Sequence, residues 1–84
     1  MITVKFFSLV REALGVQQLD LQLPHEGMTV MAVKEYLVSL HGEHWRDVLL
    51  QPNVVHALNH RVVDVNTAVE EGAELAFFPP MTGG

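Results

Sequence analysis

The two segments with the strongest strand pattern lie at opposite ends of this chain. Residues 2–7 carry apolar side chains at nearly every second position, and residues 74–78 are apolar throughout after Glu74. Alternation is typical of a strand with one buried face, and a continuous apolar run is typical of a strand covered on both faces. We therefore expect both segments at the centre of one sheet, adjacent and parallel.

An amphipathic helix is predicted over residues 29–40, with Thr29 as its N-cap and Gly42 just beyond its end. Its apolar residues follow the spacing of a single buried stripe: Val30, Val33, Leu37 and Leu40. The polar residues of the helix are expected on the opposite side: Lys34, Glu35 and Ser39. This helix should pack across one face of the sheet.

Shorter elements complete the predicted order. Ser8 is expected to cap a short helix over residues 9–14, and residues 16–23 form a second strand. Residues 43–51 hold one helical turn at most, and residues 54–58 and 61–63 form a hairpin. This order predicts the α+β class: a β-grasp (ubiquitin-like) fold with a mixed sheet and one main helix across a face. We expect a single domain over residues 1–84, with a flexible Gly-Gly tail at 79–84.

The composition argues against several function classes. The formal charge of −5 makes nucleic acid a poor partner, and no apolar run approaches the roughly 20 residues of a membrane span. We expect a cytoplasmic protein. The chain has no cysteine, and its histidines lack the spacing of a metal site, so the pairs His41 with His44 and His56 with His60 are expected to face solvent. No nucleophile–base pair or phosphate loop is visible, so we expect no enzyme activity from the chain alone.

The chemistry is expected at the carboxyl terminus, which reads FFPPMTGG over residues 77–84. Two prolines stiffen the chain where it leaves the last strand, and the six residues from Pro79 can span roughly 20 Å. Gly83 and Gly84 have no side chain, so this end can enter a channel too narrow for other residues. Gly84 then presents an unhindered carboxylate. The alternative is a frayed terminus that happens to end in glycine.

The segment AFFPPMTGG over residues 76–84 closely resembles the carboxyl terminus of the molybdopterin synthase small subunits. The opening segment VKFFSLVRE and the hairpin ALNHRVV over residues 57–63 also resemble that family. The likeness covers essentially the whole chain. Met81 departs from it, because a small β-branched residue is more usual there.

The resemblance implies a sulfur-carrier cycle. An adenylating (E1-like) enzyme uses ATP to form a glycyl adenylate at Gly84, and a sulfur donor converts it to a thiocarboxylate (1-thioglycine). The tail then enters the large subunit, within a heterotetramer of two small and two large subunits, and sulfur passes to a cyclic pterin precursor of the molybdenum cofactor. The tail-threading residues are Pro79, Pro80, Met81, Thr82 and Gly83. Phe7 and Phe78 are expected to contact the partner, and no bound cofactor or metal is expected.

Three alternatives remain open on the sequence. The chain is a sulfur carrier for thiamine synthesis or tRNA thiolation, a ubiquitin-like modifier that forms isopeptide bonds, or a β-grasp binding module with an inert tail. The double proline is not characteristic of the thiamine carriers.

Overall fold

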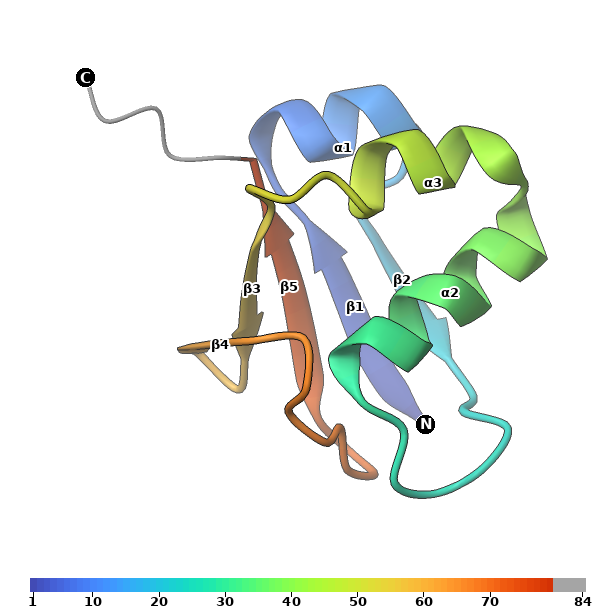
Figure 1. The fold of residues 1–84 in the computed structure, drawn as a ribbon, viewed down its shortest axis with the longest axis vertical. Coiled ribbons are helices and arrows are strands. Elements are labelled where there is room, and N and C mark those ends of the chain that lie inside the picture. The colour runs from blue at the N-terminus through green and yellow to red at the C-terminus, as the bar shows by residue number, and fades with distance from the viewer. Residues whose placement is uncertain (80–84) are drawn as a thin grey trace.

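The computed structural model describes residues 1–79 of the chain. Within this range a five-stranded sheet carries three helices on one of its faces (Figure 1). In chain order the elements are β1 (Ile2–Phe6), α1 (Ser8–Leu14), β2 (Gln18–Leu21), α2 (Val30–His41), α3 (Glu43–Leu49), β3 (Val55–Leu58), β4 (Arg61–Val63) and β5 (Glu74–Phe78). The predicted α+β class is confirmed.

The strands from the two ends of the chain lie in the middle of the sheet, whose order is β2-β1-β5-β3-β4. β1 and β5 run parallel, with Phe6 opposite Phe77, and the other neighbouring strands are antiparallel. The predicted adjacency and direction of the first and last strands are therefore confirmed. β2 is shorter than the predicted residues 16–23, because only Gln18–Leu21 pair with β1.

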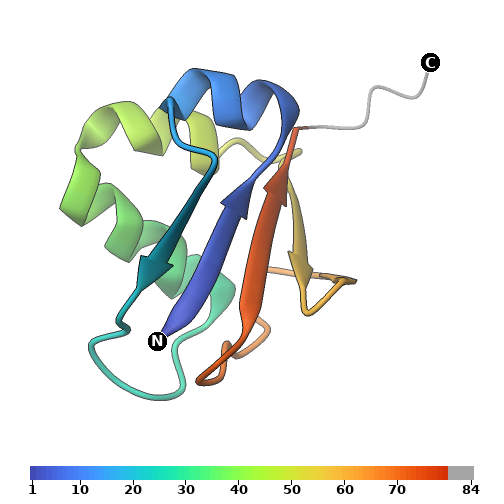
Figure 2. The same cartoon turned by 180° about the vertical axis from the view of Figure 1, so that it is seen from behind.

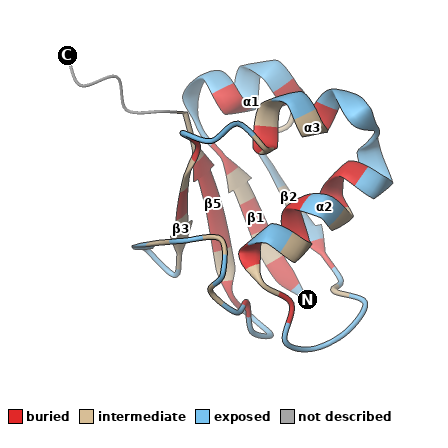
Figure 3. Cartoon of the chain, in the orientation of Figure 1, coloured by how far each residue is buried: buried red, intermediate tan, exposed pale blue. Residues whose placement is uncertain are grey.

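The core lies between the sheet and the helices, and its buried side chains concentrate in β1, β5 and the sheet-facing side of α2 (Figure 3). Phe6 stacks on Phe77 with ring centroids 5.7 Å apart, and Trp45 of α3 meets Phe6 edge-on at 5.5 Å. Aromatic pairs in these geometries contribute about 0.5–1.5 kcal/mol beyond the burial of their area. The helices are thus held on the sheet by a shared aromatic centre.

The start of α2 follows the sequence closely. Thr29 is extended, and its hydroxyl accepts a 3.1 Å hydrogen bond from the backbone N–H of Ala32. This bond satisfies one of the free donors in the first turn of the helix, so the predicted N-cap is confirmed. At the other end α2 stops at His41, and Gly42 follows with a φ of 107°.

Two predictions about the faces of α2 are wrong. Leu40, expected in the buried stripe, is 52% exposed, and Lys34, expected to face solvent, is 2% exposed. Lys34 lies four residues after Val30 and four before Val38, and both of these are buried. Residues four apart share a helix face, so Lys34 belongs to the stripe and Leu40 lies at its margin.

The first helix and the segment after α2 also differ from expectation. α1 has Phe7, not Ser8, at its N-cap position, with no side-chain cap, and Ser8 has a φ of 52°. The predicted end at Gly15 is confirmed by its left-handed conformation, with a φ of 73°. α3 forms seven helical residues where one turn was expected, because Trp45 and Leu49, four residues apart, are both buried.

Candidate functional site at the root of the tail

The tail leaves the sheet from the end of a central strand. β5 is bonded to β1 on one side and to β3 on the other, and the backbone N–H of Phe7 donates to the carbonyl of Phe77 at 3.1 Å. Pro79 follows β5 directly and is the last described residue. The predicted tail residues that follow it lie outside the described range: Pro80, Met81, Thr82, Gly83 and Gly84.

Phe7 and Phe78 meet at this point, face to face. Their ring centroids are 4.6 Å apart and the rings are within 5° of parallel. The contact follows from the parallel register, since Phe6 and Phe77 are opposite each other and the next residues of both strands point away from the core. Phe7 is 36% exposed and Phe78 is partly buried. The structure thus brings together the two residues predicted to contact a partner.

No helix formed by residues 1–79 covers the sheet face that carries this aromatic pair (Figure 2). Phe78 pairs with Val55, and Ala76 pairs with Ala57, which in turn pairs with Val62. Paired residues point to the same face of a sheet, so these side chains form a row across it. We call this row the outer apolar patch: Phe7, Val55, Ala57, Val62, Ala76 and Phe78.

Sequence reasoning missed the part of the outer apolar patch that lies on β3 and β4. Val62 is 78% exposed, which is unusual for a large apolar side chain in a strand. The available signal was the alternation in β3, where Val55 and Ala57 lie on either side of His56 and must share the opposite face. Charged side chains border the patch: Lys5 of β1 lies opposite Ala76, and its Nζ lies 3.2 Å from Oε1 of Glu74 at the start of β5.

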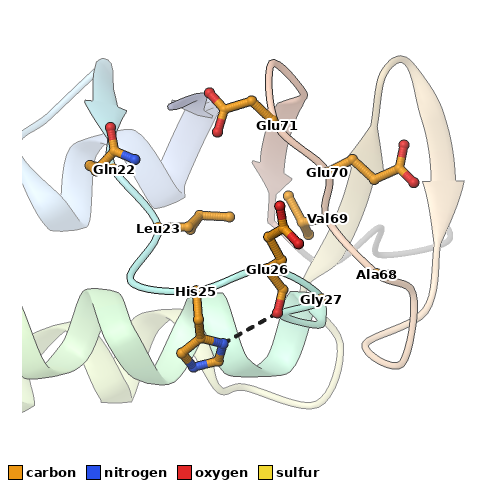
Figure 4. A pocket seen from close by; sticks show the side chains of 9 residues that line it. All are labelled: Gln22, Leu23, His25, Glu26, Gly27, Ala68, Val69, Glu70 and Glu71. Atoms are coloured by element: carbon orange, nitrogen blue, oxygen red, sulfur yellow. Dashed lines mark hydrogen bonds between the residues drawn. The ribbon is translucent and has the colours of Figure 1, made fainter.

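A hollow of about 600 Å³ lies at the other end of the sheet, beside the start of β1 and β5 (Figure 4). It is lined by the 22–27 loop and by residues 68–71, among them Glu70 and Glu71. The terminal amine of Met1 pairs with Glu71. The hollow and these acidic groups are therefore separate from the root of the tail.

The histidines do not gather into a site. Within residues 1–79, no three histidine, cysteine or acidic side chains lie close enough to hold a metal ion. His44 Nε2 lies 2.9 Å from the carbonyl of Ala13, and His41 stacks on Trp45 at 4.0 Å. The prediction that His56 faces solvent is wrong: it is 7% exposed and its Nε2 is bonded to Lys34. The inward-facing register of β3 explains its burial.

None of the helices formed by the described residues has the length and apolarity to cross a membrane.

The fold and the root of the tail define a small ubiquitin-like β-grasp protein whose last segment leaves a central strand. The chain belongs to the ThiS family, whose model matches residues 4–84. Two curated relatives are similar over the full length of both chains, at 38% identity in Haemophilus influenzae and 32% in Escherichia coli K12. Both are named molybdopterin synthase sulfur carrier subunit. The predicted resemblance is confirmed.

Solved structures show the same fold. SAMP1 from Haloferax volcanii, a small archaeal modifier protein, is 25% identical with a TM-score of 0.80, covering 99% of this chain and 98% of its own. A putative molybdopterin converting factor subunit 1 from Pyrococcus furiosus is 27% identical with a TM-score of 0.75, covering 95% and 97%. The predicted β-grasp fold is therefore confirmed.

Proposed function

We propose that this chain is the sulfur carrier subunit of molybdopterin synthase and that the Gly84 carboxylate is its working group. The observation that carries the proposal is the position at which the tail leaves the sheet. A segment ending in Gly83 and Gly84 follows a central strand directly, beside an aromatic pair of which Phe7 is exposed and Phe78 is partly buried. The full-length likeness to two sulfur carrier subunits supports it.

The chemistry requires activation of the carboxylate, because a carboxylate is a poor acyl electrophile. An adenylating partner joins the Gly84 carboxylate to AMP from ATP and releases pyrophosphate. Hydrosulfide (HS⁻) supplied by a sulfur donor then attacks the acyl carbon, the bond to AMP breaks, AMP leaves with the bonding electrons, and the sulfur releases its proton. The product is a thiocarboxylate whose sulfur is a nucleophile. Because the first step consumes ATP, we place this cycle in the cytoplasm.

The chain itself supplies position and recognition. The outer apolar patch lies beside Pro79, so a partner that takes the tail also covers Phe7 and Phe78. Exposed aromatic side chains are frequent anchors of protein interfaces. We propose the large subunit of molybdopterin synthase as this partner, in a complex of two small and two large subunits, and assign no catalytic group to the small one. A structurally similar Helicobacter pylori protein is part of a complex of subunits 1 and 2 of molybdopterin-converting factor.

A second candidate function is protein modification, favoured by the structural likeness to SAMP1. The same activated Gly84 would then form an isopeptide bond with a lysine. Both functions share the adenylate and differ in the nucleophile that follows, which is sulfur or an amine. Carriers for thiamine synthesis or tRNA thiolation share the sulfur step and differ in the acceptor.

The test is the intact mass of the full chain after incubation with ATP, the adenylating enzyme and a sulfur source. The proposal predicts a gain equal to the mass difference between sulfur and oxygen, and formation of molybdopterin when the large subunit and pterin precursor are added. A lysine-linked conjugate without thiocarboxylate would support the modifier function instead. An unchanged mass with no conjugate would mean that the tail is not modified, and this would contradict both functions.

A further inference from the structure

A groove of about 230 Å³ lies beside the root of the tail, on the helix side of the sheet. The groove is lined by Pro79, by the polar Gln51 and by apolar side chains from α1, α3 and the segment before β3. These apolar residues include Leu9, Ala13, Val48 and Val54. Leu9 is 67% exposed, although it is a large apolar side chain. Among the described residues, those that line the groove carry no charge.

The groove and the outer apolar patch lie on different sides of the point where β5 ends. Phe7 precedes α1 and faces outward, whereas Leu9 and Ala13 belong to α1 and border the groove. α1 and α3 lie next to the end of β5 in Figure 1. The last described residue, Pro79, is therefore flanked by two apolar surfaces.

The length of the remaining chain restricts where a partner can lie. Five residues follow Pro79, so Gly84 lies at most roughly 18 Å from it. An active site that holds the Gly84 carboxylate must be within the same distance. The protein that carries this active site must then lie against the surface around Pro79, and the groove is part of that surface because Pro79 lines it.

We propose that the groove is a second docking site for the large subunit, and that it receives an apolar side chain of that protein. The inference rests on the proposed function, in which Gly84 works inside the partner's active site. The groove is smaller than the about 300–1,000 Å³ typical of small-molecule sites, so a side chain fits it better than a cofactor. With the outer apolar patch on the other side, the partner holds the root of the tail from two sides and fixes its direction.

The chain offers a matched pair of exposed leucines for the test. Leu9 borders the groove on α1, and Leu40 lies on α2 without lining it. We would measure the affinity of full-length Leu9→Asp and Leu40→Asp for the cognate large subunit by titration calorimetry. Leu9→Asp is expected to weaken binding about tenfold or more, and Leu40→Asp to stay within about twofold of the wild type.

A second variant guards against a folding defect in Leu9→Asp. Ala13→Gln keeps a good helix former on α1 and places a polar side chain in the groove, so it should also weaken binding. Circular dichroism and thermal unfolding establish that each variant is folded. Wild-type affinity in a folded Leu9→Asp or Ala13→Gln protein would overturn the inference.

The same samples separate this inference from the proposed function. Wild-type protein that never acquires a thiocarboxylate contradicts the proposed function. If the wild type is thiocarboxylated and binds the large subunit, but either folded groove variant binds it with wild-type affinity, only the groove assignment is wrong.

Discussion

Lys34 Nζ lies 2.8 Å from Nε2 of His56, and both side chains are buried between α2 and β3. An ammonium can only donate, so His56 accepts at Nε2, which places its ring proton on Nδ1 and leaves the ring neutral. Within residues 1–79, no carboxylate forms an ion pair with Lys34. The core therefore holds a cation whose described partner is a neutral histidine.

This arrangement predicts acid sensitivity. Burial, and after it the positive charge of Lys34, lowers the pKa of His56 from 6.5 to about 4, against a backbone hydrogen bond with Val63 that raises it. The unfolded chain binds the proton at His56 near pH 6.5 and the folded chain near pH 4. The contribution of the neutral ring to the free energy of unfolding is therefore fully present above pH 6.5 and is lost as the pH falls from 6.5 to 4. We expect the free energy of unfolding to drop by about 2 kcal/mol between pH 7.5 and 5.

Urea unfolding at the two pH values measures this drop, with His56→Gln as the control that cannot titrate. Asp64 is the acidic residue to consider, because it and His56 both line a separate hollow of about 330 Å³ beside β3 and β4. Its Oδ1 already accepts a hydrogen bond from the backbone N–H of Asn66 at 2.8 Å. A variant with the same pH dependence as the wild type would show that other groups cause the loss.

Lys34→Met isolates the contribution of the ammonium. Burial alone lowers the pKa of Lys34, so a neutral side chain of similar length relieves the cost of a buried charge. The pKa of His56 should then rise but stay below 6.5, because burial remains its largest cause. An NMR titration of the His56 ring measures this directly, and an unchanged midpoint would contradict the coupling.

Phe78→Ala tests the outer apolar patch. The substitution removes the ring that stacks on Phe7 and should weaken the complex with the large subunit by more than about 1 kcal/mol. Binding is measured by titration calorimetry, with thermal unfolding to establish that the variant is folded. A folded variant with wild-type affinity would make the Phe7–Phe78 stack a structural feature only.

The sequence predicted the parts of the fold that depend on apolar pattern. The parallel contact of β1 and β5 follows from the apolarity of both strands, and the start of α2 follows from the capping chemistry of Thr29. Lys34 and His56 were missed because each was assigned to the surface by residue type. Only the pairing of a helix face with a strand register shows that they satisfy each other.

The sequence predicted the residues that carry the chemistry of the candidate site, but it did not predict the groove beside them. Gly84 and the two phenylalanines are visible in the sequence, because their residue types and positions carry the signal. The groove is not, since it requires α1 and α3 to lie side by side at the end of β5. α3 was predicted as one turn at most, and that left the groove without one of its walls.

The central claim is that the Gly84 carboxylate carries the sulfur, and deleting Gly84 tests it most directly. The deletion moves the carboxylate back by one residue, or roughly 3.5 Å, which is beyond the tolerance of a positioned acyl transfer. The residue follows β5 by six positions and lies outside every helix and strand of the described fold, so stability should be unchanged. The measurement is molybdopterin formation by the deletion protein, with its thermal unfolding recorded on the same sample. We predict wild-type unfolding and no molybdopterin, whereas a deletion protein that still forms molybdopterin would contradict the carrier mechanism.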